Sequence, residues 1–403
     1  MTLKTSEARA LLSAQAVRAA ANQLFELAQA DKMADWRLDL NALPACADYV
    51  AVLIGKRYPK LNVPFHARWR HFVFGGSDLW TEIRNAAAWR DPHARARAAF
   101  DLAITSVLLD AGAGPGWRYA DSATGMIAAR SEGLALASLR LFEWGAFSAD
   151  PADPLRGDAE ALARFDAAQL ADALQVSERN PLAGLDGRAR LLNRLGAHAD
   201  AHPDLFARAD RPRPGGLYDV MLARAHDGEI AAPAILDVLL EALGPIWENR
   251  PVVDGVPLGD CWQVAGFGYV PLHKLSQWLA YSLIEPLENA GVRVTEIDGL
   301  TGLAEYRNGG LFIDAGVLKP EDAEALTRSY NVADPFVVTW RALTVALLDR
   351  IAPLVRERLD VSEQVLPLAR GLEGGTWAAG RALARERRGG DPPLTIISDG
   401  TVF

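Results

Sequence analysis

The chain has 403 residues, of which 50% are hydrophobic and 23% are charged, and its formal net charge is −9. This composition is ordinary for a globular protein and supplies enough apolar material for a large core. The acidic balance, with no Lys- or Arg-rich tract, argues against nucleic-acid binding, which requires a basic surface. The chain has no run of eighteen apolar residues and no N-terminal signal-peptide pattern, so we expect a cytoplasmic protein that does not contact membranes.

Apolar residues recur with helical spacing along most of the chain, and several predicted helices open on a proline. The pattern predicts helices over Ser6–Ala30, Leu43–Tyr58, Thr81–Ala88, Pro92–Asp110, Ala128–Phe142, Asp158–Gln175, Arg179–Ala199, Ala232–Leu243, Val270–Ala290, Pro320–Ser329, Pro335–Leu359 and Pro367–Ala384. Short strands are predicted over Val292–Ile297, Leu311–Ile313 and Leu394–Ser398. We therefore expect a mainly α fold with a few short strands.

No linker demands a split of the chain into separate domains. We expect a single large helical domain, 1–403. The alternative is two lobes, an N-terminal lobe 1–210 and a C-terminal lobe 211–403 that carries the catalytic segment.

The predicted helix over Val270–Ala290 carries an unusual polar stripe. Lys274, Gln277, Trp278 and Tyr281 have the spacing i, i+3, i+4 and i+7, so they share one face. A solvated face would carry more Glu and Arg, and the stripe therefore suggests the wall of a pocket. The alternative is an amphipathic helix whose polar side meets water.

The segment 305–310, EYRNGG, follows that helix and ends in two glycines, which predict a tight turn where backbone can approach a ligand. In a pocket, Lys274 would keep Glu305 ionised. Such a carboxylate stabilises an oxocarbenium-like transition state or orients an attacking water. Asp314 is a second candidate acid or base. The alternative is that Glu305 and Arg307 form a simple surface pair.

A third cluster contains two histidines, two arginines and a tryptophan: His66, Arg68, Trp69, Arg70 and His71. Arginine binds phosphate through two hydrogen bonds and stacks on flat rings, so the cluster is a candidate for substrate binding. A buried structural network is the alternative. The spacing matches no standard zinc motif, and we predict neither a metal nor a cofactor.

The loop 112–119, GAGPGWRY, has the alternating glycines of a phosphate cradle, but no strand precedes it and the GxGxxG pattern is absent. Trp117 and Arg118 at its end are candidate ligand contacts. Cys261 as a nucleophile would need a base, for which His273 is the nearest histidine in sequence.

Five segments together resemble one protein family over the whole chain: PFHARWRHF, LYDVMLARAHDGEI, HKLSQWLAYSLIEP, LTGLAEYRNGGLFIDAGVL and SDGTVF. The family is that of the uracil-catabolism proteins of the URC pathway in fungi and bacteria. Its members are often labelled uracil phosphoribosyltransferases.

A second, more distant similarity says more about the type of reaction. HKLSQWLAYSL and LTGLAEYRNGGL resemble segments of the queuosine-salvage proteins, which hydrolyse the N-glycosidic bond of a nucleoside 5′-phosphate and are similar in fold to DNA glycosylases. Those proteins have a lysine in the first segment and an Asp-Tyr-Arg triplet in the second. The matching positions are Lys274, Glu305, Tyr306 and Arg307. Glutamate here is one methylene longer than the aspartate, and Asn-Gly-Gly replaces the usual Val-Pro-Gln, which fits a smaller base.

The two resemblances together imply a hydrolase that converts a ring-opened uracil nucleotide, such as ribosylurea 5′-phosphate, to urea and ribose 5-phosphate. They imply Glu305 and Lys274 as catalytic residues, and Asp314 is the reserve acid or base. The candidate substrate-binding residues are Arg307, Tyr306, His273, Gln277, Tyr281, His66, Arg68, Trp69, Arg70, Trp117 and Arg118. The expected partner is a small-molecule nucleotide.

Two alternatives belong to other classes of function. A uracil phosphoribosyltransferase needs a strand followed by two acids and a small-residue loop that opens a helix, and the only candidate is the terminal LTIISDGTVF, which no helix follows. A non-catalytic nucleotide-binding protein would instead respond to ligand without turnover.

Overall fold

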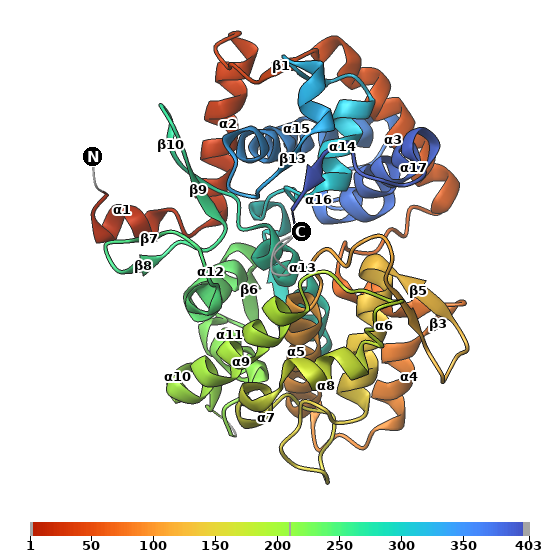
Figure 1. Ribbon diagram of the computed structural model, residues 1–403, viewed down its shortest axis with the longest axis vertical. Helices are drawn as coiled ribbons and strands as arrows, with labels where there is room; N and C mark the ends of the chain where they lie inside the picture. Colours follow the sequence, from red (N-terminus) through yellow and green to blue (C-terminus); the bar gives the residue numbers. More distant parts are fainter. Residues whose placement is uncertain (1–2, 209–210, 398–403) are drawn as a thin grey trace. The chain divides into compact units, whose positions relative to one another are not determined.

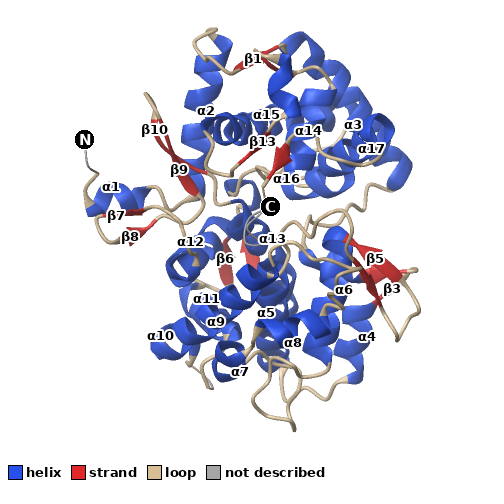
Figure 2. Ribbon diagram, viewed as in Figure 1, coloured by secondary structure: helices blue, strands red, loops and turns tan. Residues whose placement is uncertain are grey.

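The computed structural model describes residues 3–208 and 211–397, and it confirms a mainly helical protein (Figures 1 and 2). Every sheet within these ranges has only two strands. No helix in the described residues is both long and apolar enough to cross a bilayer. The chain folds into two compact units. The first contains residues 3–66, 250–277 and 296–397, and the second contains 67–208, 211–249 and 278–295. The predicted alternatives, one domain or lobes that meet at residue 210, stay predictions.

The first unit is built around α15, Pro335–Leu359. Every residue from Phe336 to Leu348 is buried, as in a helix that other helices surround. Asp334 caps its start by accepting the N–H of Phe336 (2.9 Å), and Pro335 occupies the first turn, as the sequence predicts. Figure 1 shows α2 beside it, in red against blue. The other helices of this unit are α1 (Thr5–Ala10), α2 (Ala14–Gln29), α3 (Leu43–Arg57), the start of α13 (Lys274–Asn289), α14 (Tyr306–Asp314), α16 (Leu368–Gly371) and α17 (Trp377–Arg388).

Short strand pairs close the loops of the first unit. Three are antiparallel, β1 (Trp36–Leu38) with β12 (Leu318–Pro320), β7 (Val252–Val253) with β8 (Val256–Pro257), and β9 (Cys261–Val264) with β10 (Gly268–Pro271). One is parallel, β13 (Ser329–Tyr330) with β14 (Thr395–Ile396). The unit also has 3₁₀ turns at Leu40–Ala42, Ile297–Gly299 and Ala323–Thr327, and a π-helical turn at Leu372–Thr376.

The second unit is built around α5, Pro92–Leu108, in which every residue from Ala98 to Leu108 is buried. Asp91 caps this helix by accepting the N–H of Ala94 (2.7 Å). The other helices are α4 (Leu79–Ala86), α6 (Arg130–Glu143), α7 (Ala159–Arg164), α8 (Ala167–Ala173), α9 (Leu185–Ala201), α10 (Pro203–Phe206), α11 (Leu217–Arg224), α12 (Ala232–Leu243) and the rest of α13 from Trp278. The strand pairs are β2 (Val73–Phe74) with β3 (Ser77–Asp78), β4 (Arg118–Ala120) with β5 (Ile127–Ala129), and β6 (Glu229–Ala231) with β11 (Arg293–Thr295), and 3₁₀ turns lie at Arg68–Phe72, Pro214–Gly216 and Gly244–Ile246.

A buried aspartate in α5 organises the loops of the second unit. Asp101 accepts hydrogen bonds from the Arg213 guanidinium (Nε, 2.8 Å), from the Gly157 N–H (3.0 Å) and from the Gly215 N–H. Burial raises the pKa of Asp101, while Arg213 opposes that shift. One carboxylate therefore anchors two loops to the central helix.

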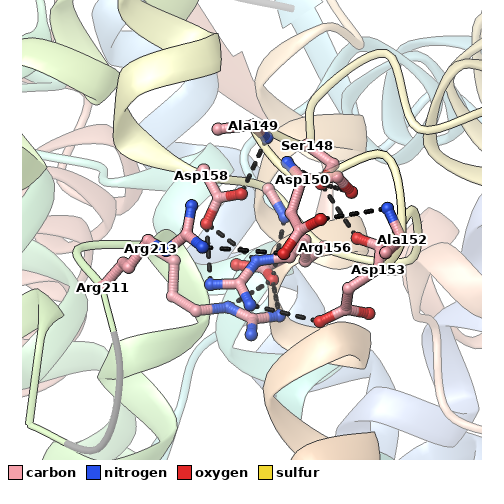
Figure 3. A network of polar contacts seen from close by, with 11 residues as sticks. Ser148, Ala149, Asp150, Ala152, Asp153, Arg156, Asp158, Arg211 and Arg213 are labelled. Carbon is pink, nitrogen blue, oxygen red and sulfur yellow. Dashed lines mark hydrogen bonds and ion pairs between the residues drawn. The ribbon is translucent and has the colours of Figure 1, made fainter.

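The loop before α7 is held by a second arginine, shown in Figure 3. Arg156 donates to Asp158 (Nε to Oδ1, 2.8 Å) and to Asp153 (Nη1 to Oδ2, 3.1 Å). The other oxygen of Asp158 accepts the Ala149 N–H (2.8 Å). This loop is thus fixed by charged hydrogen bonds and not by a strand or helix.

Two predicted helices are interrupted in the structure, and both are interrupted for the same reason. The helix predicted over Ser6–Ala30 breaks because Ser13 caps a new helix by accepting the N–H of Ala16. The helix predicted over Asp158–Gln175 breaks where Asp166 forms a capping box with Gln169. In both places a polar side chain satisfies free backbone N–H groups better than a continuous helix would.

Other corrections concern the choice of element. The helix predicted over Pro320–Ser329 is wrong, since Pro320 ends β12 and only a 3₁₀ turn follows. The strand predicted at Leu311–Ile313 lies inside α14. The predicted glycine turn at 309–310 is also helical, and neither glycine has a positive φ. Two helices begin several residues later than predicted. One begins at Lys274 and not at Val270, and the other begins at Leu185 and not at Arg179.

Close helix packing explains two glycines of the first unit, Gly309 and Gly380. A Cβ at Gly309 would lie 2.6 Å from the Trp340 ring, and one at Gly380 would lie 1.9 Å from the Arg307 carbonyl oxygen. Figure 1 shows α14 and α17 in neighbouring positions of the unit, and they pack together directly. The glycines are therefore needed for space and not for a special backbone conformation.

We expect Gly380→Ala to lower the free energy of unfolding by about 1–3 kcal/mol, because the added methyl group must push α17 away from α14. Urea unfolding at constant pH measures the change. Gly55→Ala in α3 is the matched control: its Cβ meets no atom within 4 Å, and alanine favours a helix by up to about 1 kcal/mol. Equal stability of the two variants would contradict the close packing of α17 on α14.

Candidate active site

The start of α13 is held by one aspartate that precedes it by fourteen residues. Asp260 accepts the N–H of Lys274 through its carboxylate (3.0 Å). Its backbone carbonyl accepts the N–H groups of Leu272 (2.9 Å) and His273 (3.1 Å). Asp260 therefore determines where the helix begins and satisfies its first free N–H groups.

A buried arginine from α15 joins this helix start to the start of α14. Arg341, which is 1% exposed, binds both oxygens of Asp260 (2.8 and 2.7 Å). Its Nε also donates to the carbonyl of Ala304 (3.1 Å), the residue before Glu305. One guanidinium thus brings together the two segments that the sequence predicts to form a site.

The ionised form of Asp260 is stabilised by its neighbours, although burial disfavours a charge. Burial by itself raises the pKa of a carboxyl group. Here the attraction of Arg341, the Arg341 hydrogen bonds, and donors from Trp262 Nε1 (2.8 Å) and Lys274 N outweigh burial, and they hold the pKa of Asp260 well below its usual range. Asp260 is therefore a carboxylate at any physiological pH.

A second link joins the same two segments. The side chain of Gln277 accepts the N–H of Thr301 (2.9 Å) and donates to the Thr301 hydroxyl. Both residues are fully buried. Gln277, a predicted substrate contact, thus fixes the loop that leads to Glu305.

Glu305 is the N-cap of α14. Its carboxylate accepts the N–H groups of Arg307 (2.7 Å) and Asn308, and the side chain is almost fully buried. The positive end of the helix dipole favours a carboxylate at this position. Because a carboxylate has about four acceptor sites, the two backbone donors leave capacity for a water or a substrate hydroxyl.

The two residues at the start of α13 differ in exposure. The Lys274 side chain is partly exposed, whereas His273 is 1% exposed. His273 Nε2 lies 2.9 Å from the carbonyl of Leu11, so Nε2 carries the proton and Nδ1 is left as an acceptor. No donor among the described residues reaches Nδ1. Burial lowers the pKa of His273, which favours this neutral form.

The remaining predicted residues of α14 point to different partners. Arg307 lies over the ring of Tyr306 (4.9 Å) and donates to the carbonyl of Gly390 (2.9 Å). Asp314 lies at the far end of the helix, about 14 Å along the axis from Glu305. Both of its oxygens are bound by Arg388 (2.8 and 2.6 Å). This pairing gives Asp314 a structural task at that end.

His66 belongs to a separate polar pair in the first unit. Its Nδ1 lies 2.7 Å from the Glu373 carboxylate, in the π-helical turn, and both side chains are buried. Its ring lies 5.5 Å from that of Trp377. The pair ties the segment before the second unit to the π-helical turn, an irregularity that is frequent at functional sites.

Arg68 lies in the second unit within a buried network. Its guanidinium binds the hydroxyl of Ser106 (2.7 Å) and the carboxylate of Asp110, and it lies 5.6 Å from the Trp278 ring. In the described residues its Nη2 has no acceptor. Burial lowers the pKa of Arg68, although Asp110 opposes the shift.

The other predicted contacts of the second unit are spread over its surface and core. Trp69 donates to the Ser282 carbonyl (2.6 Å), and Arg70 binds both oxygens of Glu285. The remaining three are the buried Trp117, the exposed Arg118 and the buried Tyr281. Trp117 Nε1 donates to the Leu174 carbonyl (2.9 Å), and Arg118 donates to backbone carbonyls of its own loop.

Neither of the two cysteines is suited to act as a nucleophile, and the possible metal ligands are scattered over the described residues. In the part of the chain that the structure describes, no three His, Cys, Asp or Glu side chains gather as metal ligands would. Burial raises the pKa of Cys46 to about 12 and raises that of Cys261 as well. A thiolate nucleophile is therefore disfavoured at both cysteines.

Neither Asp260 nor Arg341 is assigned a role from the sequence alone. The available signal for Arg341 is a charged residue within the apolar run from Phe336 to Leu348, since a buried charge requires a partner. The identity of that partner is not visible in the sequence.

Similarity to known proteins extends over almost the whole chain. A family model described as "Protein of unknown function (DUF1688)" matches residues 10–403. The chain belongs to the DUF1688 family. It is 36% identical to "Protein urg3" of Schizosaccharomyces pombe over 414 residues, covering 100% of both chains. It is 35% identical to "Uracil catabolism protein 4" of Lachancea kluyveri over 438 residues, covering 97% of this chain and 98% of the relative. The predicted resemblance to uracil-catabolism proteins is confirmed.

The pH dependence of stability tests the role of Asp260 in this DUF1688 chain. Its folded pKa lies below the unfolded value of about 3.9, so its contribution is complete above that pH and is lost as the pH falls below it. The difference in unfolding free energy between the wild type and Asp260→Asn should therefore shrink by about 1.4 kcal/mol per pH unit below pH 4. Urea unfolding at pH 7, 4 and 3 measures it.

At neutral pH, Asp260→Asn should cost about 3–5 kcal/mol, because Arg341 is left buried without its counter-charge. Asp334→Asn, at the cap of α15, is the control and should cost no more than about 1 kcal/mol. A pH-independent difference between Asp260→Asn and the wild type would show that Asp260 is not the compensating charge.

Proposed function

We propose that this protein acts in uracil catabolism as an N-glycoside hydrolase. The proposed substrate is a ring-opened uracil nucleotide such as ribosylurea 5′-phosphate, and the products are urea and ribose 5-phosphate. The name of the Lachancea kluyveri relative supports the pathway. The likeness of the segments around Lys274 and Glu305 to the queuosine-salvage hydrolases supports the type of reaction.

The observation that carries the proposal is the joining of two helix starts by Arg341. Arg341 binds Asp260, which holds the N–H of Lys274. Arg341 also binds the carbonyl of Ala304, the residue before Glu305. These bonds link the backbone of Lys274, which follows the neutral His273, to the backbone that precedes Glu305, across about thirty residues of sequence. A purely structural ion pair would not require a lysine, a histidine and a carboxylate beside the residues that it joins.

The reaction breaks the bond between C1′ of ribose and the urea nitrogen and forms a bond between C1′ and a water oxygen. Positive charge develops on the sugar as the nitrogen departs. In our proposal the Glu305 carboxylate stabilises that charge and accepts a proton from the attacking water. The leaving nitrogen takes up one proton, so that urea and ribose 5-phosphate balance substrate and water.

Lys274 and His273 have supporting tasks in this scheme. Lys274 orients Glu305 and the ribose, and its partial exposure suits a group that meets a ligand. The acceptor Nδ1 of His273 suits a ribose hydroxyl or a urea N–H group. Asp314, which is bound to Arg388, has no task in the proposed reaction.

Product analysis by mass spectrometry tests the function. The purified protein should release urea and ribose 5-phosphate from ribosylurea 5′-phosphate, and Glu305→Gln should lower the rate by about 10²- to 10⁴-fold, because a neutral amide cannot accept the proton. Asp334→Asn is again the control, since it alters a cap of the same unit without altering Glu305. It should turn over at the wild-type rate.

Two further measurements distinguish the alternative functions. Formation of UMP from uracil and phosphoribosyl pyrophosphate would identify a transferase and overturn the hydrolase. Ligand-induced stabilisation without turnover of any of these substrates would identify a binding protein.

Lys274→Met separates the side chain of Lys274 from its backbone. The bond to Asp260 comes from the backbone N–H, so the helix start is retained in the variant. We expect the turnover number to fall at least about tenfold because Glu305 and the ribose lose their orienting charge. Wild-type turnover in Lys274→Met, measured with the same product assay, would remove Lys274 from the mechanism.

A further inference from the structure

The second unit contains an open cleft that plays no part in the proposed reaction. Its empty volume, which includes the part open to solvent, is about 450 Å³. The 3₁₀ turn Arg68–Phe72, α4, α5 and the C-terminal part of α13 form its walls. The side chains that matter are those of Trp69, Arg70, Asp78, Arg84, Arg95 and Glu285.

Both carboxylates of the cleft have partners within the protein. Arg70 binds both oxygens of Glu285 through Nη2 (2.8 and 2.7 Å). Asp78 caps α4 by accepting the N–H and the hydroxyl of Thr81 (3.0 and 2.9 Å). These bonds leave the carboxylates engaged with their own neighbours.

Two arginines of the cleft are not compensated in this way. Among the residues that the structure describes, the Arg84 guanidinium makes no hydrogen bond or ion pair and is only attracted over a longer distance by Glu285. Arg95 donates to the neutral carbonyl of Asn289 (3.1 Å). Arg97, two residues further along α5, shows the contrast, because it binds both oxygens of Asp219 (2.7 and 2.8 Å).

Two buried N–H donors at the cleft also indicate that an anionic ligand binds there. Arg70 Nε and Arg84 Nε are shielded from solvent, and neither has an acceptor within the described ranges. A buried N–H group without an acceptor is costly, and a ligand oxygen would recover that cost. The lining thus combines excess positive charge, three guanidinium groups against two carboxylates, with unused donors.

We infer that this cleft is a binding site for a phosphate or phosphate-monoester group. Three guanidinium groups reach it from three different elements, which suits a tetrahedral anion with several acceptor oxygens better than a planar carboxylate with two. The whole chain carries a net charge of −9, so an anion must be attracted by such a local cluster. The site lies entirely in the second unit and does not rest on Glu305 or on the proposed reaction.

Calorimetric titration of the full chain tests the site with inorganic phosphate, ribose 5-phosphate and, as the uncharged comparison, ribose. Phosphate and ribose 5-phosphate should bind, and ribose should not. Arg84→Gln and Arg95→Gln should each raise the dissociation constant about ten- to a hundredfold, the effect of a lost charged hydrogen bond. Arg90→Gln, an exposed arginine of the same region outside the cleft, should leave it unchanged.

The same titration separates this site from the proposed active site, because Glu305→Gln should retain phosphate binding whether or not the hydrolase proposal holds. Tighter binding of ribose 5-phosphate than of inorganic phosphate would show that the cleft takes the ester. The reverse order would show that it takes the free ion.

Chemical modification supplies a second readout at the residue itself. Phenylglyoxal should modify Arg84 quickly, since this guanidinium has no partner in the described residues, and phosphate should protect it, as measured by mass spectrometry of the Arg84 peptide. Phosphate binding that survives in the Arg84→Gln/Arg95→Gln double variant, or Arg84 modification that phosphate does not slow, would overturn the inference. Absence of any phosphate binding to the wild type would also overturn it.

Discussion

Arg341 carries a full positive charge into the apolar centre of the first unit, and the way that charge is compensated positions the candidate site. A buried guanidinium without a partner would be prohibitively costly. Asp260 supplies the counter-charge. The same aspartate caps α13, so the residue that neutralises Arg341 also determines where α13 begins. The Nε of Arg341 then takes the Ala304 carbonyl, which places the cap of α14. Removing either charge would release both helix starts.

The second unit uses the same principle at Asp101, where one carboxylate inside a central helix holds Arg213 and two backbone N–H groups. Such satisfied networks are rigid and specify one arrangement of loops. The cleft lined by Arg84 and Arg95 departs from this pattern, and the departure is informative. Arg68, Arg213 and Arg341 are each paired with an aspartate. Arg84 and Arg95 lie at a concave surface without a carboxylate partner among the described residues, and an anionic ligand would supply one.

Glu305 has both a structural and a proposed chemical role, and the two are compatible. A cap residue is held by two backbone donors, so its carboxylate keeps one orientation without help from other side chains. A catalytic carboxylate needs the same restraint. The proposed reaction therefore uses a group that the fold already positions, and the full-length similarity to the two relatives indicates that they share this fold.

The sequence by itself determined the family, the helical class and the bounds of those elements whose signals are local. Ala232–Leu243 and Pro335–Leu359 are predicted with the bounds that the structure has, because a proline in the first turn and apolar spacing are signals local to each helix, and Asp334 caps the second one. The segment 305–314 was misread, since its glycines serve close packing against Trp340 and α17, far along the chain. The late start of α13 depends on Asp260, and Asp260 in turn depends on Arg341, 81 residues away. Only the tertiary structure decided these points, because a buried charge shows in the sequence that it needs a partner but not which partner the fold will bring to it.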